Sequence, residues 1–217
     1  MGTKLLLSKR VLCVTFGDSI TEGYGASDES HRWANIVTTT KGWTLINSGI
    51  GGTNLQNTVQ TSLAVIGGAT VNNGRDTYTT RITAYEPTKV IILYGFNDLL
   101  LNDEAYSDTL FANDLGEIID GLTSTGIAAV NILIGSPPYM PEASYTRQAP
   151  PRNGGSRIKH AAYTAACASV AAAKGCKYAD VYQYMADNGG DTLIGGDGFH
   201  PNDAGYAAIA TAILAEL

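Results

Sequence analysis

The chain has 217 residues, of which 44% are hydrophobic and 16% are charged, which predicts a single domain over residues 1–217 with a large buried core. The net charge of −6 argues against a nucleic acid as partner. No run of residues approaches a membrane span, and charge interrupts the apolar N-terminal stretch too early for a signal peptide, so we expect a soluble form, either cytoplasmic or an excised domain of a secreted protein.

Five apolar runs alternate with helix-patterned segments along the chain. The runs span residues 11–16, 43–47, 89–94, 129–134 and 178–181. This alternation predicts parallel β-α units that build one central sheet of about five strands. Helices are expected on both faces of that sheet, so the predicted fold class is α/β.

Three segments carry clear helix signals. Ser107 is a predicted N-cap, and the apolar residues after it keep helical spacing as far as Gly126, where the helix is expected to end. Residues 156–174 are rich in alanine and stop at Gly175. The C-terminal residues repeat the same apolar rhythm from 206 to 217, which predicts a terminal helix.

Ser19 lies where the first predicted strand turns into a helix. Residues 16–24 read Phe-Gly-Asp-Ser-Ile-Thr-Glu-Gly-Tyr and directly follow the run that begins at residue 11. A serine here has an exposed hydroxyl, and its backbone N–H belongs to a first helical turn, where amide donors are unpaired and negative charge is favoured. This suits a nucleophile that also stabilises an oxyanion, although a tight turn capped by Ser19 explains the same residues.

Two glycine- and asparagine-containing stretches follow the second and third predicted strands, at residues 47–54 and 95–98. If the first strand lies between those two strands, all three strand ends meet at one edge of the sheet. The backbone N–H of Gly52 and the side-chain amide of Asn97 would then converge with the Ser19 N–H on one oxyanion. Ordinary turns and a helix cap remain alternatives, and a nucleotide site is disfavoured because Asn54 stands where the last glycine of Gly-x-Gly-x-x-Gly belongs.

A serine nucleophile needs a base, and the sequence offers three histidines. His200 precedes the terminal helix, and Asp197 is spaced to orient its ring. The same Asp-x-x-His spacing recurs at Asp28 and His31, so spacing alone does not choose between them. We favour His200 because Pro201 stiffens its loop, whereas His31 begins a polar segment typical of a solvated helix start; His160 is interpreted as part of a cationic helix surface.

An irregular loop of unusual length spans residues 135–155 and follows the fourth predicted strand. Loops of this length inside a compact domain are often functional. We expect it to overhang the site and to contribute substrate contacts from Tyr139, Tyr145 and Arg147. With Met140 and Arg152 these residues form a mixture that suits a sugar or another polar alcohol better than a long lipid chain. Simple packing of the loop is an equal alternative, and residues 67–76 are a second candidate wall.

Four blocks of the sequence together resemble the SGNH hydrolase superfamily, the GDSL-like esterases and lipases. They occur in the family's order across nearly the whole chain and read Gly17-Asp18-Ser19, Asn47-x-Gly49-x-x-Gly52, Gly95-x-Asn97-Asp98 and Asp197-x-x-His200-Pro201. One departure is small: Ile20 stands where the family's usual name has leucine.

The resemblance implies a flavodoxin-like three-layer α/β/α sandwich with Ser19 as nucleophile, His200 as base and Asp197 as its orienting carboxylate. It also implies an oxyanion hole made by the N–H groups of Ser19 and Gly52 and the amide of Asn97. Neither a metal nor an organic cofactor follows from it. The cysteines, which lack metal-binding spacing, are interpreted as buried free thiols: Cys13, Cys167 and Cys176. Asp18 and Asp98 are interpreted as structural carboxylates that bond turn amides.

The resulting hypothesis is a serine esterase that hydrolyses carboxylic esters through an acyl-enzyme, with a small-molecule or glycan ester as substrate. Short acyl groups are favoured, including O-acetyl groups on carbohydrate. The rival enzyme is a lipase-like esterase, lysophospholipase or thioesterase, which would need an apolar groove. A hypothesis of another class is a non-catalytic carbohydrate-binding module.

Overall fold

Five parallel strands form one sheet in the order β2-β1-β3-β4-β5 in the computed structural model, which describes residues 10–57 and 72–217. The strands are β1 (Leu12–Gly17), β2 (Thr44–Gly49), β3 (Lys89–Leu93), β4 (Ile132–Gly135) and β5 (Lys177–Ala179). The predicted α/β fold with a parallel central sheet is confirmed. Strand β1 lies between β2 and β3, as the argument for a shared site edge requires.

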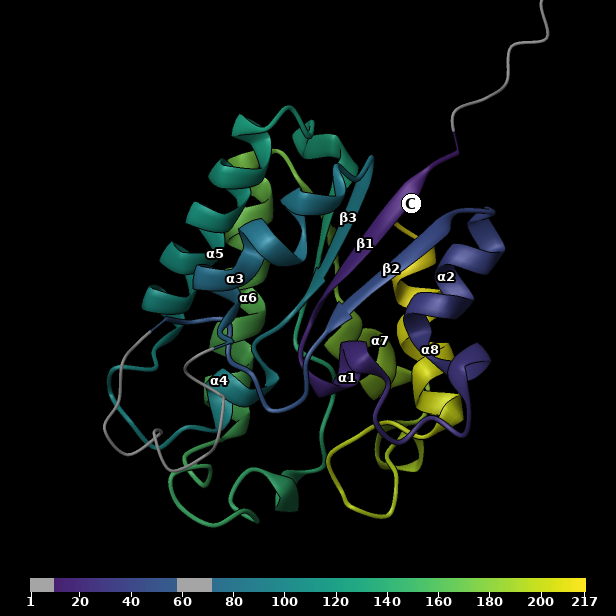
Figure 1. Cartoon of the computed structure of the whole chain (residues 1–217). Helices are drawn as coiled ribbons and strands as arrows, with labels where there is room; N and C mark the ends of the chain where they lie inside the picture. The colour runs from purple at the N-terminus through teal and green to yellow at the C-terminus, as the bar shows by residue number, and fades with distance from the viewer. Residues whose placement is uncertain (1–9, 58–71) are drawn as a thin grey trace, which may run out of the picture.

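Helices cover both faces of the sheet and complete three layers (Figure 1). Helices α3 (Gly74–Arg81), α5 (Asp108–Ser124) and α6 (Arg157–Lys174) lie on one face, and α2 (Trp33–Lys41) and α8 (Asp203–Leu214) lie on the other. Shorter helices complete the described chain and are α1 (Ser19–Glu22), α4 (Phe96–Leu100) and α7 (Val181–Asp187). Because the sheet is covered on both faces, its inner strands β1, β3 and β4 are mainly apolar and buried, whereas the edge strand β2 also carries polar residues.

The predicted helix signals act as expected at the caps. The Ser107 hydroxyl accepts a hydrogen bond from the Leu110 N–H at 3.2 Å, and the Ser156 hydroxyl accepts one from the Lys159 N–H at 3.0 Å. Gly175 ends α6 in the left-handed conformation. The strand boundaries differ from prediction by one to three residues, most clearly where residues 129–131 form a 3₁₀ turn before β4 and where Val181 already begins α7.

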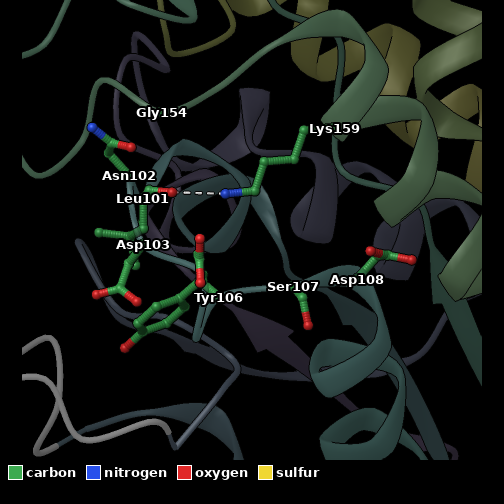
Figure 2. Close-up of a pocket in the computed structure, with 9 residues that line it drawn as sticks. Leu101, Asn102, Asp103, Tyr106, Ser107, Asp108, Gly154 and Lys159 are labelled. Carbon is green, nitrogen blue, oxygen red and sulfur yellow. Dashed lines mark hydrogen bonds between the residues drawn. The ribbon is translucent and has the colours of Figure 1, made fainter.

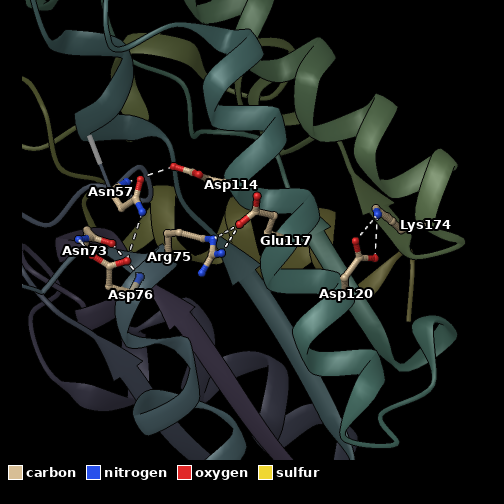
Figure 3. Close-up of polar contacts among 8 residues, drawn as sticks. All are labelled: Asn57, Asn73, Arg75, Asp76, Asp114, Glu117, Asp120 and Lys174. Carbon is tan, nitrogen blue, oxygen red and sulfur yellow. Dashed lines mark hydrogen bonds and ion pairs between the residues drawn. The ribbon is translucent and has the colours of Figure 1, made fainter. Parts of the chain in front are cut away.

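Ion pairs and amide contacts fasten α3 and α6 to α5 (Figure 3). The Arg75 Nε donates to Glu117 at 2.7 Å, and the Lys174 ammonium lies 2.7 Å from Asp120. Of the second candidate wall at 67–76, residues 67–71 lie outside the described residues and residues 74–76 begin α3. In the described chain, no helix combines the length and apolarity needed to cross a bilayer.

The cysteine thiols are free, as predicted, and Cys13 and Cys167 are buried, whereas Cys176 is only partly buried. His160 departs from its prediction more sharply, because it is fully buried rather than part of a cationic surface. It lies on the face of α6 that also buries Tyr163 and Cys167, at positions i, i+3 and i+7, so helical periodicity contained the signal.

The buried His160 ring is hydrogen-bonded at both nitrogens. Its Nε2 lies 3.0 Å from the Pro137 carbonyl and therefore donates, so Nδ1 accepts from the Tyr145 hydroxyl at 2.9 Å. The Tyr182 ring meets the imidazole edge-on at 4.4 Å. Burial lowers the pKa of His160 to about 4, the Pro137 bond opposes that shift, and nearby Arg157 adds to it.

Acid should therefore destabilise the fold through His160. A group whose pKa is lower in the folded than in the unfolded state costs stability as pH falls from about 6.5, where the unfolded chain takes up the proton, to about 4. We expect wild type to lose up to about 3 kcal/mol of unfolding free energy relative to His160→Phe over that range. Urea denaturation of both proteins at pH 4 to 7 measures it, and a pH-independent difference would contradict it.

Candidate active site

Ser19 is the first residue of α1 and stands at the carboxyl edge of the sheet. The preceding Asp18 caps the helix, since its Oδ1 accepts the Ile20 N–H at 2.9 Å. Helix α1 packs closely on the end of β2: a Cβ atom at Gly49 would lie 2.1 Å from the Glu22 nitrogen. This backbone contact fixes how far Ser19 projects from the sheet.

His200 and Asp197 complete a hydrogen-bonded chain with Ser19. The Ser19 Oγ lies 2.9 Å from His200 Nε2, and His200 Nδ1 lies 2.6 Å from Asp197 Oδ2. The second carboxylate oxygen, Oδ1, accepts the backbone N–H groups of Phe199 and His200 at 2.8 and 3.0 Å. An ionised Asp197 fixes the tautomer with hydrogen on Nδ1, so Nε2 is free to accept the Ser19 proton.

The pKa of Asp197 lies below its ordinary value. Partial burial raises it, but the hydrogen bonds from the Phe199 N–H and from His200 together outweigh that effect. The carboxylate is therefore charged throughout the range in which imidazole titrates.

The competing pair, Asp28 and His31, lies elsewhere. His31 Nδ1 lies 3.1 Å from Asp28 Oδ2 and 3.1 Å from the Ser27 hydroxyl, and about half of the side chain is exposed. These residues form the 3₁₀ turn Glu29–His31 and its cap, the solvated helix start that the sequence indicates. Of the two Asp-x-x-His pairs, only the one at His200 touches Ser19 in the structure.

Gly52 occupies a tight turn at residues 50–53. The Thr53 N–H lies 3.4 Å from the Ile50 carbonyl, and the Thr53 hydroxyl donates to that same carbonyl at 2.8 Å. The φ angle of Gly52 is +75°, the value of the third residue in a type II turn. In a type I turn the peptide between Gly51 and Gly52 is flipped, which reverses its N–H, so glycine at 52 selects the direction of that donor.

Asn97 lies in the first turn of α4 and is buried. One N–H of its amide donates to the Thr53 carbonyl at 2.9 Å, which fixes the side chain. An amide nitrogen carries two hydrogens, so a second donor remains. Asn97 therefore links the turn of Gly52 to the helix after β3.

A pocket of about 250 Å³ adjoins these groups. It is lined by Ser19, Glu22, Tyr24, Gly51, Gly52, Phe96, Asn97, Gln148, Arg152, Phe199 and His200. The candidate nucleophile, base and oxyanion donors thus face one small cavity, as acyl transfer requires.

A model of the GDSL-like Lipase/Acylhydrolase family matches residues 15–208. The chain belongs to this family. It is accordingly a carboxylic ester hydrolase. A comparison with curated proteins gave no match.

Solved structures share the fold at low sequence identity. A lipase/acylhydrolase from Enterococcus faecalis is 22% identical with a TM-score of 0.72, and the match covers 95% of this chain and 94% of that one. A carbohydrate acetylesterase family member from Sinorhizobium meliloti is 16% identical with a TM-score of 0.71, covering 94% and 96%. An acetyl-xylooligosaccharide esterase from Geobacillus is 18% identical with a TM-score of 0.65, covering 95% and 93%. At these identities the likeness concerns the fold.

The structure does not bring Tyr139, Tyr145 and Arg147 to the pocket of this esterase. The Tyr139 hydroxyl donates to Asp191 at 2.6 Å, away from Ser19. Tyr145 is buried against His160. The exposed Arg147 lies over the Phe199 ring, with its guanidinium 5.9 Å from the ring centre. Residues 137–145 fold back onto the core, so the predicted overhang comes from the end of the loop instead.

Six side chains line the pocket beyond the predicted catalytic and oxyanion residues: Glu22, Tyr24, Phe96, Gln148, Arg152 and Phe199. Glu22 ends the short helix that begins at Ser19 and lies three residues from it on the same face, which was a usable signal, whereas Tyr24 follows the Gly23 cap of that helix. Gln148 and Arg152 come from the end of the long loop. Their placement depends on contacts with residues distant in sequence, so no local pattern indicates it.

Asp18 and Asp98 act as predicted on turn amides. Asp98 accepts the N–H groups of Leu55 and Gln56 at 3.0 and 2.9 Å. Both carboxyls are buried, and that burial raises the pKa of Asp18 to about 7 and of Asp98 to about 6.

A larger hollow of about 570 Å³ lies beside α5 and α6 (Figure 2). Its lining includes Lys159, whose ammonium donates to the Leu101 carbonyl at 2.7 Å, and Ser107, which caps α5. No histidine is among its described lining residues. In the described ranges, no group of three or more histidine, cysteine or acidic side chains is arranged to hold a metal ion.

Substituting Gly52 should separate the effect of turn geometry on activity from its effect on stability. A Cβ at Gly52 would meet only an Arg152 nitrogen, at 3.9 Å, but the positive φ favours a flip of the turn. We expect Gly52→Ala to lower kcat on an aryl acetate by roughly a hundredfold to a thousandfold, the usual cost of one oxyanion donor.

Gly42→Ala is the matched control, because Gly42 also has positive φ (+67°) and open space around it, at the end of α2. Both variants should lose about 1 kcal/mol of unfolding free energy. Equal activity of the two variants would refute a role for the Gly52 turn.

Proposed function

We propose that the protein is a serine esterase in which Ser19 is the nucleophile, His200 the general base and Asp197 the residue that orients it. The observation that carries this proposal is the unbroken hydrogen-bonded chain from Ser19 Oγ through His200 to Asp197, with Gly52 and Asn97 on the same pocket. Few structural roles require that combination of groups at one point.

In the proposed mechanism the Ser19 oxygen attacks the ester carbonyl while His200 Nε2 takes its proton. The resulting oxyanion accepts hydrogen bonds from the N–H groups of Ser19 and Gly52 and from the Asn97 amide. The tetrahedral intermediate collapses as His200 returns the proton to the leaving alcohol. Water then attacks the acyl-enzyme with the same base, and a second tetrahedral intermediate releases the acid and Ser19.

Short acyl groups fit the proposed site best. The cavity is small, and its lining mixes polar side chains such as Glu22, Gln148 and Arg152 with aromatic rings. Each buried CH₂ contributes about 0.8 kcal/mol to binding, so a preference for long chains requires an extended apolar groove. A lipase-like esterase, lysophospholipase or thioesterase activity is therefore the weaker proposal.

An O-acetylated carbohydrate is the proposed natural substrate class. Tyr24 lines the pocket with 62% of its surface exposed, and its ring lies 4.5 Å from the His200 ring. An exposed aromatic face beside the base can stack on the apolar face of a sugar, while Glu22 and Gln148 offer hydrogen-bond partners for hydroxyls. The two carbohydrate esterases that share the fold support this proposal.

The catalytic assignment is tested by aryl acetate, butyrate and octanoate hydrolysis. Wild type should cleave acetate fastest, and Ser19→Ala and His200→Ala should lose up to about a millionfold in kcat because the triad acts as a unit. His31→Ala should keep the wild-type rate. An inert wild type would instead favour a carbohydrate-binding module, and binding to intact polysaccharides would then be measured.

The sugar assignment is tested by the ratio of kcat/KM on an acetylated monosaccharide to kcat/KM on an aryl acetate. Tyr24→Ala should lower this ratio by roughly threefold to tenfold, the usual worth of a stacked ring. The ratio is needed because Tyr24 also packs on His200 and its loss affects both substrates. Tyr85→Ala removes another exposed tyrosine, in the 3₁₀ turn Thr83–Tyr85, and should leave the ratio unchanged. An unchanged ratio in Tyr24→Ala would remove this support for a sugar substrate.

A further inference from the structure

We propose that Arg152 is a positioning residue of the oxyanion site, which holds the turn of Gly52 in its productive orientation from the far end of the long loop. This inference rests on the proposed esterase function. Its starting point is one contact: the Arg152 Nη2 donates to the Gly52 carbonyl at 2.7 Å, across 100 positions of sequence. A hydrogen bond from a charged donor is about twice as strong as a neutral one.

The turn needs such support because two glycines form its centre. Gly51 and Gly52 have no side chains to anchor, and the Thr53 N–H to Ile50 carbonyl distance is long at 3.4 Å. The peptide on one side of Gly52 carries the proposed donor N–H, and the peptide on the other side carries the carbonyl that Arg152 binds. Fixing that carbonyl restricts rotation about the Gly52 backbone and so restricts the flip that would turn the N–H away.

Asn97 and Arg152 donate hydrogen bonds to successive carbonyls of this turn. Asn97 binds the Thr53 carbonyl at 2.9 Å, directly after the Gly52 carbonyl held by Arg152. Both side chains also line the pocket. The turn is therefore held at two consecutive peptides by side chains from two different segments.

The segment that carries Arg152 is itself fastened to the end of α4, the helix of Asn97. The Arg152 N–H donates to the Ala149 carbonyl at 3.0 Å, which closes a turn. On either side of Arg152, the Pro151 carbonyl accepts the Asn102 N–H at 2.7 Å, and the Gly154 N–H donates to the Leu100 carbonyl at 2.8 Å. Asn97 and Arg152, which both bind the turn of Gly52, are thus both anchored at helix α4.

Electrostatics keep the guanidinium charged in this place. Burial lowers the pKa of Arg152, whereas the carboxyls of Asp18 and Asp98 raise it, and a guanidinium stays protonated in proteins. Its Nε is buried and has no hydrogen-bond partner. Burial of the side chain therefore has a desolvation cost, and the hydrogen bond to the Gly52 carbonyl offsets only part of it. This is expected of a group retained for its effect on the site.

Arg152→Met and Arg152→Lys test this role on an aryl acetate. Methionine keeps the length of the side chain and removes the donor, and we expect kcat to fall by roughly tenfold to a hundredfold with KM within about twofold. Lysine restores one charged donor and should recover part of the loss. Arg157→Met is the control, because Arg157 is an exposed arginine that pairs with Glu142 of the same loop, and it should behave as wild type.

A boronic acid distinguishes positioning from general destabilisation. The Ser19 oxygen adds to the trigonal boron of methylboronic acid, its proton passes to His200, and a tetrahedral anion forms without a leaving group. Arg152→Met should weaken inhibition by methylboronic acid by the same factor as it lowers kcat. An unchanged kcat, a rise in KM alone, or a lower kcat with unchanged boronate affinity would each overturn the role.

The proposed function is scored separately with Ser19→Ala in the same assays. If Ser19→Ala abolishes hydrolysis while Arg152→Met leaves both kcat and boronate inhibition unchanged, only the inference about Arg152 fails. If Ser19→Ala still hydrolyses the ester and is still inhibited by the boronic acid, the proposed serine mechanism fails, and the inference about Arg152 fails too. Arg152→Lys keeps the inference testable even if the methionine variant does not fold. For the lysine variant we expect wild-type KM, with kcat and boronate affinity both partly lowered.

Discussion

Close backbone packing between helix α1 and the carboxyl ends of β1 and β2 is the constraint on which the site depends. Side chains are excluded at two glycines: a Cβ at Gly17 would lie 2.0 Å from the Thr21 hydroxyl, and one at Gly49 would overlap the Glu22 backbone. The Asn47 amide adds a hydrogen bond to the Thr21 carbonyl at 2.8 Å. With α1 held this way, Ser19 faces His200 and the short helix has no freedom to tilt.

Two arginines stabilise this arrangement through hydrogen bonds to backbone carbonyls. Arg81 is buried beneath it, donates to the Gly17 carbonyl at 3.0 Å and to the Ser48 carbonyl, and lies over the Phe16 ring at 4.4 Å. Arg152 acts on the Gly52 carbonyl. In both cases a guanidinium donates to backbone oxygens at or shortly after the end of a strand, where irregular backbone needs such partners.

Sequence reasoning found the parts of this site that follow from topology. Parallel strands end at one edge, so blocks after β1, β2 and β3 had to meet, and the structure places Ser19, Gly52 and Asn97 together. It could not separate His200 from His31 by spacing, because that choice depends on how the last loop returns to the sheet. The side chains of residues 135–155 were unpredictable for the same reason: their directions are set by long-range contacts such as Tyr145 with His160.

The backbone bonds that fasten residues 151–154 to Leu100 and Asn102 divide the long loop into two parts that are held to different degrees. The fastened end carries Arg152, which binds the Gly52 carbonyl. The stretch around Thr146 and Arg147 is exposed and bound to neither the turn of Gly52 nor α4. Changes in loop length or sequence there leave the bonds to the turn of Gly52 and to α4 in place, and they reach the pocket through the packing of Arg147 on the Phe199 ring.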